Sequence, residues 1–234
     1  MTATYLWTPP PVYSLPVRGT TQRLPINRLF FVGRNYHAHA VEMGQPVDKS
    51  VERPFYFTKS PSTLVGSGAT VAYPPETQNY QHEMELVVAI GQPGFRVMPS
   101  DAAALVYGYA CGLDMTRRDV QLAARDKGRP WDLGKDVEQS SVVSEIVPML
   151  GRVLTHGELA LTVNGQPRQQ SDLDKLIWSI PELIADLSLF YHLQPGDLIF
   201  TGTPEGVGPV VAGDRIEGRI DDVGAIVLDV GPAE

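Results

Sequence analysis

The sequence predicts a mainly β protein of the α+β class, in which a few peripheral helices accompany many short strands. Leu86–Ile90 is an apolar run rich in β-branched residues and ended by glycine, which is typical of a buried strand. Asn164-Gly165 joins two extended segments with the residue pair that a type I′ hairpin turn prefers. Helical patterns are few and do not alternate regularly with strands, as they would in a doubly wound sheet.

The composition is that of a globular protein without a nucleic-acid surface. The chain has 234 residues, of which 43% are hydrophobic and 20% are charged, enough for one large domain with a full core. Its formal net charge of -8 disfavours binding to nucleic acid, which requires clustered Lys and Arg.

Cysteine content and hydropathy indicate the compartment. Cys111 is the single cysteine, which excludes an internal disulfide and a cysteine-based metal site and suits a reducing environment. No apolar run reaches the ~18 residues of a membrane span. The N-terminus lacks the basic and apolar parts of a secretion signal. We therefore expect a cytoplasmic protein with no membrane partner.

The chain divides into an arm and one domain. Residues 1–25 are punctuated by prolines and predict an extended arm, with short pieces such as Val12–Leu15 that suit an edge strand or a packing segment. Residues 26–234 show no internal repeat and no low-complexity segment, so we expect a single domain there.

The first half of this domain predicts two strands separated by a helix and a loop. Residues 28–33 form an apolar strand, and Tyr36–Met43 predicts a short helix with Gly44 at the C′ position. Residues 45–54 are polar with a proline near each end, the composition of a mobile loop. Residues 55–59 predict another strand.

Further along, strands and helices continue to mix. Ser100-Asp101 predicts the cap of a helix that runs toward Val106, residues 108–113 predict a buried strand, and residues 116–128 are helical in pattern. Ser179 and Glu182 form a capping box with proline in the first turn. The apolar face predicted for that helix comprises Leu183, Ile184, Leu187 and Phe190. Residues 198–200 and 214–230 predict the last strands.

Two glutamates precede the buried run at residues 86–90. Side chains alternate along a strand, so Glu83 and Glu85 point to the same face, roughly 6–7 Å apart. Two carboxylates that enter an apolar core must share a proton or hold a cation. The alternative is a strand that begins in solvent, with both acids on its wet side.

Asp114 ends the apolar run Val106–Leu113 and is a candidate third carboxylate. Such an oxygen-only set suits Mg²⁺ or Mn²⁺, with water in the other positions. The alternative role of Asp114 is to cap the helix at residues 116–128.

His39 and Glu42 are neighbours at i and i+3 on the predicted helix. A carboxylate beside an imidazole fixes its tautomer and raises its basicity, which is what the activation of a water molecule requires. A solvated surface pair is the alternative reading. Thr201–Pro209 follows a strand and is rich in glycine, so its N–H groups and hydroxyls can face a carboxylate, although an ordinary turn explains it equally well.

Taken together, these segments resemble the fumarylacetoacetate hydrolase family. They fall in the family's order and cover roughly residues 28–230. The matching segments are Phe31–Tyr36, His39–Met43, Phe57–Lys59, His82–Leu86, Gly108–Asp114, Arg118–Gln121, Gly128–Lys135 and Gly196–Gly208.

The resemblance implies a rolled, mixed β-sheet like that of the fumarylacetoacetase C-terminal domain, usually assembled as a homodimer, and makes residues 26–234 the catalytic domain. It implies a divalent cation, Mg²⁺ or Mn²⁺, at the positions of Glu83, Glu85 and Asp114.

The resemblance also implies roles for other side chains. The His39/Glu42 pair would belong to a lid that activates water, and Lys135 and Gln121 would lie beside the reacting carbonyl. Arg118 and Thr203 would contact a substrate carboxylate or support the site.

The activity implied is hydrolysis of a C–C bond in a 2,4-diketo acid. Tyr5–Pro11, Asp114–Gln121 and Gly128–Asp132 are most similar to family members that cleave 3-fumarylpyruvate to fumarate and pyruvate in gentisate-type aromatic degradation. Gly134 and Asp136–Glu138 depart from the common pattern beside Lys135, which puts the choice of substrate in doubt. Alternative activities are hydrolysis of other acylpyruvates and decarboxylation of oxaloacetate. A domain that binds carboxylates or cations without catalysis is a further alternative.

Overall fold

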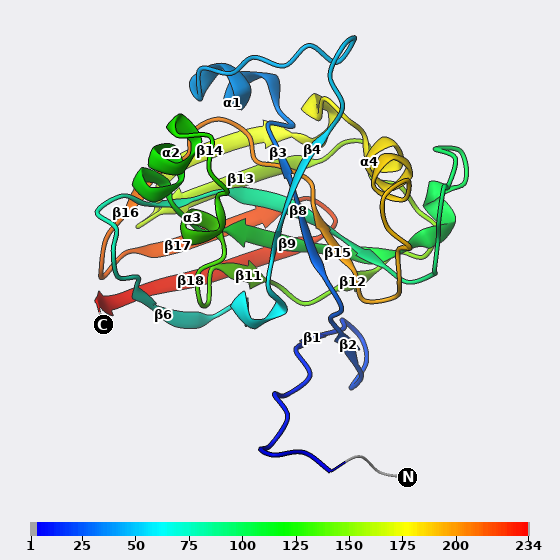
Figure 1. Ribbon diagram of the computed structural model, residues 1–234, viewed down its shortest axis with the longest axis horizontal. Helices are drawn as coiled ribbons and strands as arrows, with labels where there is room; N and C mark the ends of the chain where they lie inside the picture. Colours follow the sequence, from blue (N-terminus) through cyan, green and yellow to red (C-terminus); the bar gives the residue numbers. More distant parts are fainter. Residues whose placement is uncertain (1–3, 234) are drawn as a thin grey trace.

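The computed structural model describes residues 4–233. Its main feature is a large mixed β-sheet that curls around a core, with a second sheet packed against it (Figure 1). Along the large sheet the strands are β4 (Phe55–Lys59), β3 (Leu29–Gly33), β15 (Leu198–Phe200), β8 (Met84–Ile90), β9 (Val106–Asp114), β11 (Ser141–Val143) and β5 (Leu64–Gly66), and β12 (Val147–Pro148) also pairs with β9. The pairs β3–β15 and β5–β11 are parallel and the others are antiparallel.

The remaining strands form one five-stranded sheet and two small ones. The five-stranded sheet has the order β14 (Gln166–Asp172), β13 (Glu158–Val163), β17 (Arg215–Ile220), β18 (Gly224–Ala233) and β6 (Ala69–Tyr73). The small sheets are β10 (Thr116–Arg117), β7 (Tyr80–His82) and β16 (Gly208–Val210), and the pair β1 (Ser14–Pro16) and β2 (Arg23–Pro25).

The helices are short and lie outside the sheets. They are α1 (His37–Glu42), α2 (Arg118–Asp126), α3 (Asp132–Lys135) and α4 (Ile180–Leu187), with 3-10 turns at Pro61–Thr63, Ala102–Leu105 and Leu173–Lys175. In Figure 1, α1 lies above the upper end of β3, and α2 and α3 lie together at one side. No helix in the described range 4–233 is long and apolar enough to cross a membrane.

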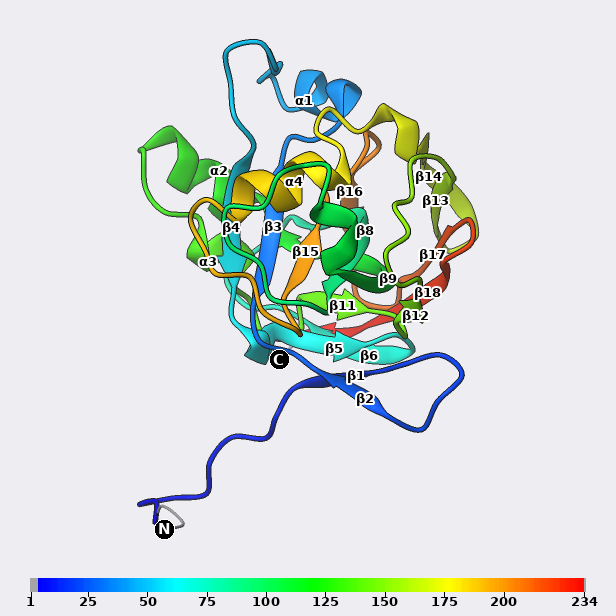
Figure 2. The same ribbon diagram turned by 90° about the vertical axis from the view of Figure 1, so that its right-hand side faces the viewer.

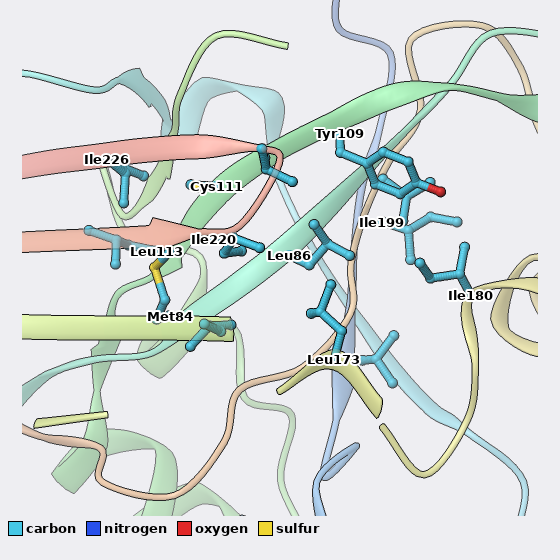
Figure 3. Packing of buried hydrophobic residues seen from close by; sticks show 14 of the residues in the cluster. Met84, Leu86, Tyr109, Cys111, Leu113, Leu173, Ile180, Ile199, Ile220 and Ile226 are labelled. Atoms are coloured by element: carbon cyan, nitrogen blue, oxygen red, sulfur yellow. The ribbon is translucent and has the colours of Figure 1, made fainter. Parts of the chain in front are cut away.

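Strand β8 is buried on both faces, which explains why its sequence is apolar except at Glu85. Met84 and Leu86 contribute to the large core between the two sheets, where Figure 3 shows them near Ile220. Val87 and Ala89 contribute to a smaller core on the other face. Because Glu85 alternates with Met84 and Leu86, its carboxylate lies on the face of Val87 and Ala89.

The two sheets approach closely at Gly218 of β17. A Cβ at this position would lie 2.6 Å from the sulfur of Met84, closer than van der Waals contact allows. A larger residue there would displace the flexible Met84 thioether, so glycine lets the five-stranded sheet pack on the first residues of β8 without this shift.

The N-terminal arm contacts the body through its second half. Leu15 and Val17 are buried, and Arg18 N–H donates to Ile146 O at 2.9 Å. Residues 4–12 lead away from the body, and Tyr5 is exposed (Figure 2). The division of the chain at residue 25 stays a prediction.

The predicted fold class is confirmed, and so are most elements. Asn164 and Gly165 both have positive φ angles, 51° and 73°, as a type I′ turn requires. In the capping box, Ser179 N–H donates to the Glu182 carboxylate at 2.8 Å. Gly44 has a φ of 69°, which is the left-handed conformation expected at C′.

Some predicted boundaries differ from the structure. The segment after Asp101 is a 3-10 turn, and the Asp101 side chain makes no capping hydrogen bond. The pattern over residues 116–128 begins as strand β10 and becomes helical only at Arg118. The apolar face predicted for α4 was wrong at Phe190, because the helix ends at Leu187 and Phe190 is 62% exposed.

Candidate active site

Three buried carboxylates converge where β8 begins and β9 ends. Glu83 lies between β7 and β8, Glu85 is in β8 and Asp114 ends β9. The two strands pair antiparallel, and Asp114 N–H donates to Glu83 O at 2.9 Å. One oxygen from each carboxylate lies within 4.8 Å of the others. The sequence therefore places acids from distant positions together, and the alternative of a solvated strand end was wrong.

Glu83 and Asp114 are paired with cations. Lys135 Nζ lies 2.8 Å from Glu83 Oε2 and 2.6 Å from Asp114 Oδ2. Lys59 Nζ lies 2.6 Å from Asp114 Oδ1, and Arg118 pairs with Glu83.

These pairs act against burial in setting the ionisation of the two acids. Although burial opposes ionisation, Lys135 and Arg118 hold the pKa of Glu83 well below its usual range. For Asp114, burial raises the pKa in spite of Lys135 and Lys59.

Glu85 is the carboxylate without a cationic partner. Its only hydrogen bond in the described structure comes from Gly202 N–H, which donates to Oε2 at 2.7 Å. Burial, and then the charges of Asp114 and Glu83, raise the pKa of Glu85 well above its usual value. A buried carboxylate of this kind needs additional positive charge to stay ionised, so the oxygen-only donor set fits a bound divalent cation.

The N–H group that contacts Glu85 depends on a glycine. Gly202 has a φ of 98°, and a Cβ there would lie 2.7 Å from the Cβ of Asn35. Both the conformation and the close approach therefore require glycine. The Asn35 side chain donates in turn to Thr201 O at 2.8 Å and fixes the start of this loop.

The His39/Glu42 pair on α1 is formed, and His39 is buried rather than on the surface. His39 Nδ1 lies 3.1 Å from Glu42 Oε2, and the His39 side chain is 8% exposed. Gly206 N–H donates to Glu42 Oε1 at 3.1 Å. The glycine-rich loop at residues 201–209 thus serves both acids, through Gly202 toward Glu85 and through Gly206 toward Glu42.

The side chains of Arg118 and Thr203, which were predicted to contact the substrate or to support the site, are hydrogen-bonded to other groups of the protein. Arg118 Nε donates to Gln81 Oε1 at 2.8 Å and its Nη1 donates to Gln121 Oε1 at 2.5 Å. Thr203 Oγ1 donates to Met84 O at 2.8 Å. Of the two roles predicted for Arg118 and Thr203, these contacts favour support of the site.

A single cavity brings the predicted residues together. Every predicted site residue except Glu42 lines it. Phe57 and Trp131 add an aromatic wall, and Arg34 and Arg125 add positive charge. The catalytic, ligand and substrate roles of these residues stay predictions, although their proximity is now a structural fact.

Sequence reasoning missed two residues that hold the site together. Lys59 ends β4 and is fully buried against Asp114 and Ser140. Gln169 of β14 accepts from Met84 N–H at 3.0 Å and donates to Thr203 Oγ1 at 2.8 Å. A lysine at the end of the apolar run Phe55–Thr58 was a usable signal for Lys59. Gln169 lies in a polar strand and gave none.

Comparison with known proteins assigns the chain to a family. Residues 28–231 match the model of the fumarylacetoacetate (FAA) hydrolase C-terminal domain. The chain belongs to the fumarylacetoacetate hydrolase family. This family domain covers the large sheet, the five-stranded sheet and all the site residues described above.

Within the fumarylacetoacetate hydrolase family, fumarylpyruvate hydrolases are similar to this chain. The fumarylpyruvate hydrolase of Ralstonia sp. is 70% identical over 192 residues, which is 82% of this chain and 100% of that protein. The crystal structure of fumarylpyruvate hydrolase from Pseudomonas aeruginosa, in complex with Mn²⁺ and pyruvate, superposes with a TM-score of 0.93 at 44% identity. That comparison covers 99% of this chain and 100% of the other.

Family members with another activity are also similar. A mitochondrial oxaloacetate tautomerase of Mus musculus is 40% identical over 204 residues, or 87% of this chain and 91% of that protein. Membership of the fumarylacetoacetate hydrolase family is therefore compatible with more than one reaction.

Proposed function

We propose that this protein is a metal-dependent hydrolase that cleaves 3-fumarylpyruvate into fumarate and pyruvate. One observation carries the proposal: three buried carboxylates converge beside the His39/Glu42 pair, with one of them lacking a cationic partner. This arrangement provides a cation site and a base that share one cavity. The 70% identity to the Ralstonia sp. fumarylpyruvate hydrolase supports this substrate.

Glu83, Glu85 and Asp114 would hold Mg²⁺ or Mn²⁺. When bound, the divalent cation would supply positive charge where negative charge develops on the 2-oxo acid part of the substrate. The Mn²⁺ and pyruvate in the structure of the Pseudomonas aeruginosa enzyme support this assignment.

His39 and Glu42 would generate the nucleophile. Glu42 accepts a hydrogen bond from His39 Nδ1, which leaves Nε2 free to take a proton from a water molecule. The hydroxide then attacks the C4 carbonyl of the diketo acid, and the bond between C3 and C4 breaks. Gly206 N–H keeps Glu42 in place during this step.

Lys135 would assist the departure of pyruvate. Its ammonium group is buried between Glu83 and Asp114 and also donates to Thr116 Oγ1 at 2.8 Å. A fixed positive charge at this position stabilises negative charge on the leaving group without any reorganisation. C3 of the departing pyruvate finally takes up a proton, so that fumarate and pyruvate are released.

Oxaloacetate chemistry is the second candidate, because of the identity to oxaloacetate tautomerases. Oxaloacetate also carries a 2-oxo acid group, so the same carboxylates and Lys135 would serve it. The identities favour hydrolysis, at 70% to the fumarylpyruvate hydrolase against 40% to the oxaloacetate tautomerase, whereas the buried His39/Glu42 pair would serve as a base in either reaction.

The proposal extends to the setting of the enzyme. We place it in the cytoplasm as a homodimer, with residues 1–25 as an arm on a catalytic domain formed by residues 26–234, and with no nucleic-acid or membrane partner. Sedimentation velocity of the purified protein tests the dimer, and a monomer across the micromolar range would contradict it.

The test of function is an assay of the metal-free protein and of the protein with Mg²⁺ or Mn²⁺. We expect metal-dependent loss of diketo-acid absorbance with fumarylpyruvate and far slower consumption of oxaloacetate. His39→Ala should lower kcat by about 10²- to 10⁴-fold and leave metal affinity unchanged. A fully active His39→Ala variant excludes the water-activating pair, and absence of turnover on every diketo acid excludes the hydrolase.

A further inference from the structure

We infer that Arg125 determines specificity by binding the distal carboxylate of the substrate, the one at the end of the acyl arm. This inference rests on the proposed function, because it concerns a diketo acid with a carboxylate at each end. The proposed reaction places the 2-oxo acid end at the carboxylate cluster. The acyl end must then lie further along the same cavity, and its charge needs a partner once it leaves water.

One face of α2 provides that partner. Arg118, Gln121, Leu122 and Arg125 follow the spacing i, i+3, i+4 and i+7, and all of them line the cavity. Arg118 stands at the carboxylate cluster, paired with Glu83. Arg125 is seven residues further on, or about 10 Å along the helix axis. An extended chain of six carbon–carbon bonds spans roughly 7–8 Å, so a substrate anchored at the cluster reaches the turn that carries Arg125.

The guanidinium of Arg118 is fully occupied by hydrogen bonds within the protein, whereas that of Arg125 is available to a ligand. The Arg118 guanidinium already donates to Gln81, Gln121 and Glu83 and is buried. Arg125 contacts only its exposed neighbour Asp126 among the residues that the structure describes, at 3.2 Å through Nε and Nη2. Such an exposed pair contributes little and is exchanged at small cost, whereas a planar guanidinium binds a carboxylate through two parallel hydrogen bonds.

Two other arginines near the site are less suited than Arg125 to bind the distal carboxylate of the substrate. Arg34 also lines the cavity, but its partner Glu52 is 35% exposed against 66% for Asp126, so the Arg34–Glu52 pair is less screened by water and costs more to exchange. Arg129 lines an adjoining cavity, which shares Phe57, Trp131 and Lys135 with the cavity of the carboxylate cluster, but Arg129 itself does not line the latter. Arg129 therefore supplies a matched control of the same type and charge, four residues away.

The experiment compares two substrates that differ at the acyl end. Fumarylpyruvate carries the distal carboxylate, and acetylpyruvate ends in a methyl group. We expect Arg125→Gln to lower the ratio of kcat/KM for fumarylpyruvate to that for acetylpyruvate by roughly 10- to 100-fold, the value of one charge-assisted hydrogen bond. Arg125→Lys should recover part of the ratio, and Arg129→Gln should leave it unchanged.

The outcomes separate this inference from the proposed function. If the unmodified enzyme hydrolyses fumarylpyruvate and the Arg125→Gln and Arg125→Lys variants both keep its ratio, the inference is overturned while the function stands. A fall of the ratio in Arg129→Gln instead of Arg125→Gln also overturns it. If the unmodified enzyme hydrolyses neither diketo acid, the proposed function itself fails.

Discussion

Ion pairs in the cavity and ion pairs on the five-stranded sheet use the same chemical groups under opposite conditions. At the carboxylate cluster that lines the cavity, Lys59 pairs with Asp114, and their side chains are 0% and 1% exposed. On the outer face of the five-stranded sheet, Arg219 and Glu158 are 53% and 31% exposed. Water screens the second pair and not the first, so a lost partner has very different consequences in the two places.

The carboxylates of the cavity also differ from one another in whether they have a cationic partner. Glu83 and Asp114 each have a lysine or arginine within hydrogen-bond reach, but Glu85 has only the Gly202 N–H group. A buried carboxylate without a cationic partner, such as Glu85, does not stabilise the fold, so stability alone does not explain its presence. The buried pairs therefore surround one acid, Glu85, which under the proposed function would be a ligand of the added cation.

The largest effect on stability is expected for Lys59→Met. The substitution keeps the volume of the side chain but leaves Asp114 with one cation fewer in the core. We expect the free energy of unfolding to fall by roughly 3–5 kcal/mol, as for other buried pairs that lose one partner. Urea unfolding followed by circular dichroism measures this value. A loss of stability as small as that expected for an exposed ion pair would contradict the proposed difference between buried and exposed pairs.

Glu85→Gln should separate function from stability. Loss of a ligand should lower metal-dependent activity by about 100-fold or more, since even the residues that orient ligands contribute 10- to 100-fold. The metal-free variant should be as stable as the unmodified protein or more stable, because a buried carboxyl without a cation is removed.

Titration with Mn²⁺ and urea unfolding of the metal-free protein measure the two parts of the Glu85→Gln prediction. Unchanged Mn²⁺ affinity would contradict the ligand role. A destabilisation as large as that of Lys59→Met would contradict the contrast between paired and unpaired acids.

Cys111 tests the effect of burial on a titratable group that has no ion-pair partner, with only a small opposing effect of Arg18 on its pKa. The thiol lies in the large core, and burial raises its pKa to about 12. It should therefore stay protonated and resist alkylation by iodoacetamide at pH 8 in the folded protein, and react readily in urea. Mass spectrometry of the alkylated protein measures both. Rapid modification of the native protein would show that the core opens locally.

The smallest effect is expected on the sheet surface. Arg219→Gln removes the pair with Glu158, which is exposed and screened by solvent. We expect only a slight change in the free energy of unfolding, and a smaller one at high salt. Urea unfolding at two salt concentrations measures it, with Lys59→Met as the reference. A large change that persists in salt would contradict the assignment of this pair to the surface class.

Much of the fold and of the candidate site could be predicted because local patterns carry them. The spacing of Glu83 and Glu85 predicted that both acids face one site, although Glu83 lies just before β8 and not in it, and the end of an apolar run marked Asp114. Lys59 also ends an apolar run, but its contact with Asp114 could not be predicted, because β4 and β9 lie four places apart in the large sheet. The order of strands in a sheet is set by packing over the whole chain, so such a contact leaves no periodic trace in the sequence.

Boundaries failed where tertiary contacts override local preference. Arg117 continues a helical pattern but belongs to β10, because it pairs with Tyr80 in the small sheet. Phe190 continues the apolar spacing of α4, but the helix stops at Leu187 and the ring lies under the guanidinium of Arg53, 5.0 Å from its centre. In both cases the local sequence pattern favours helix, but a contact with a distant segment determines the structure that forms.

The hydrogen bond from Gly202 to Glu85 has a consequence for genetic studies of this enzyme. Its donor is a peptide N–H group, so among the amino acids only proline would delete it, and proline cannot adopt the φ of 98° found at this position. Gly202→Ala would instead displace Asn35 and with it the whole turn. A mutational scan would therefore find position 202 intolerant because of steric clashes. Replacing the amide that donates to Glu85 by a backbone ester would instead remove only the N–H group and so measure its contribution.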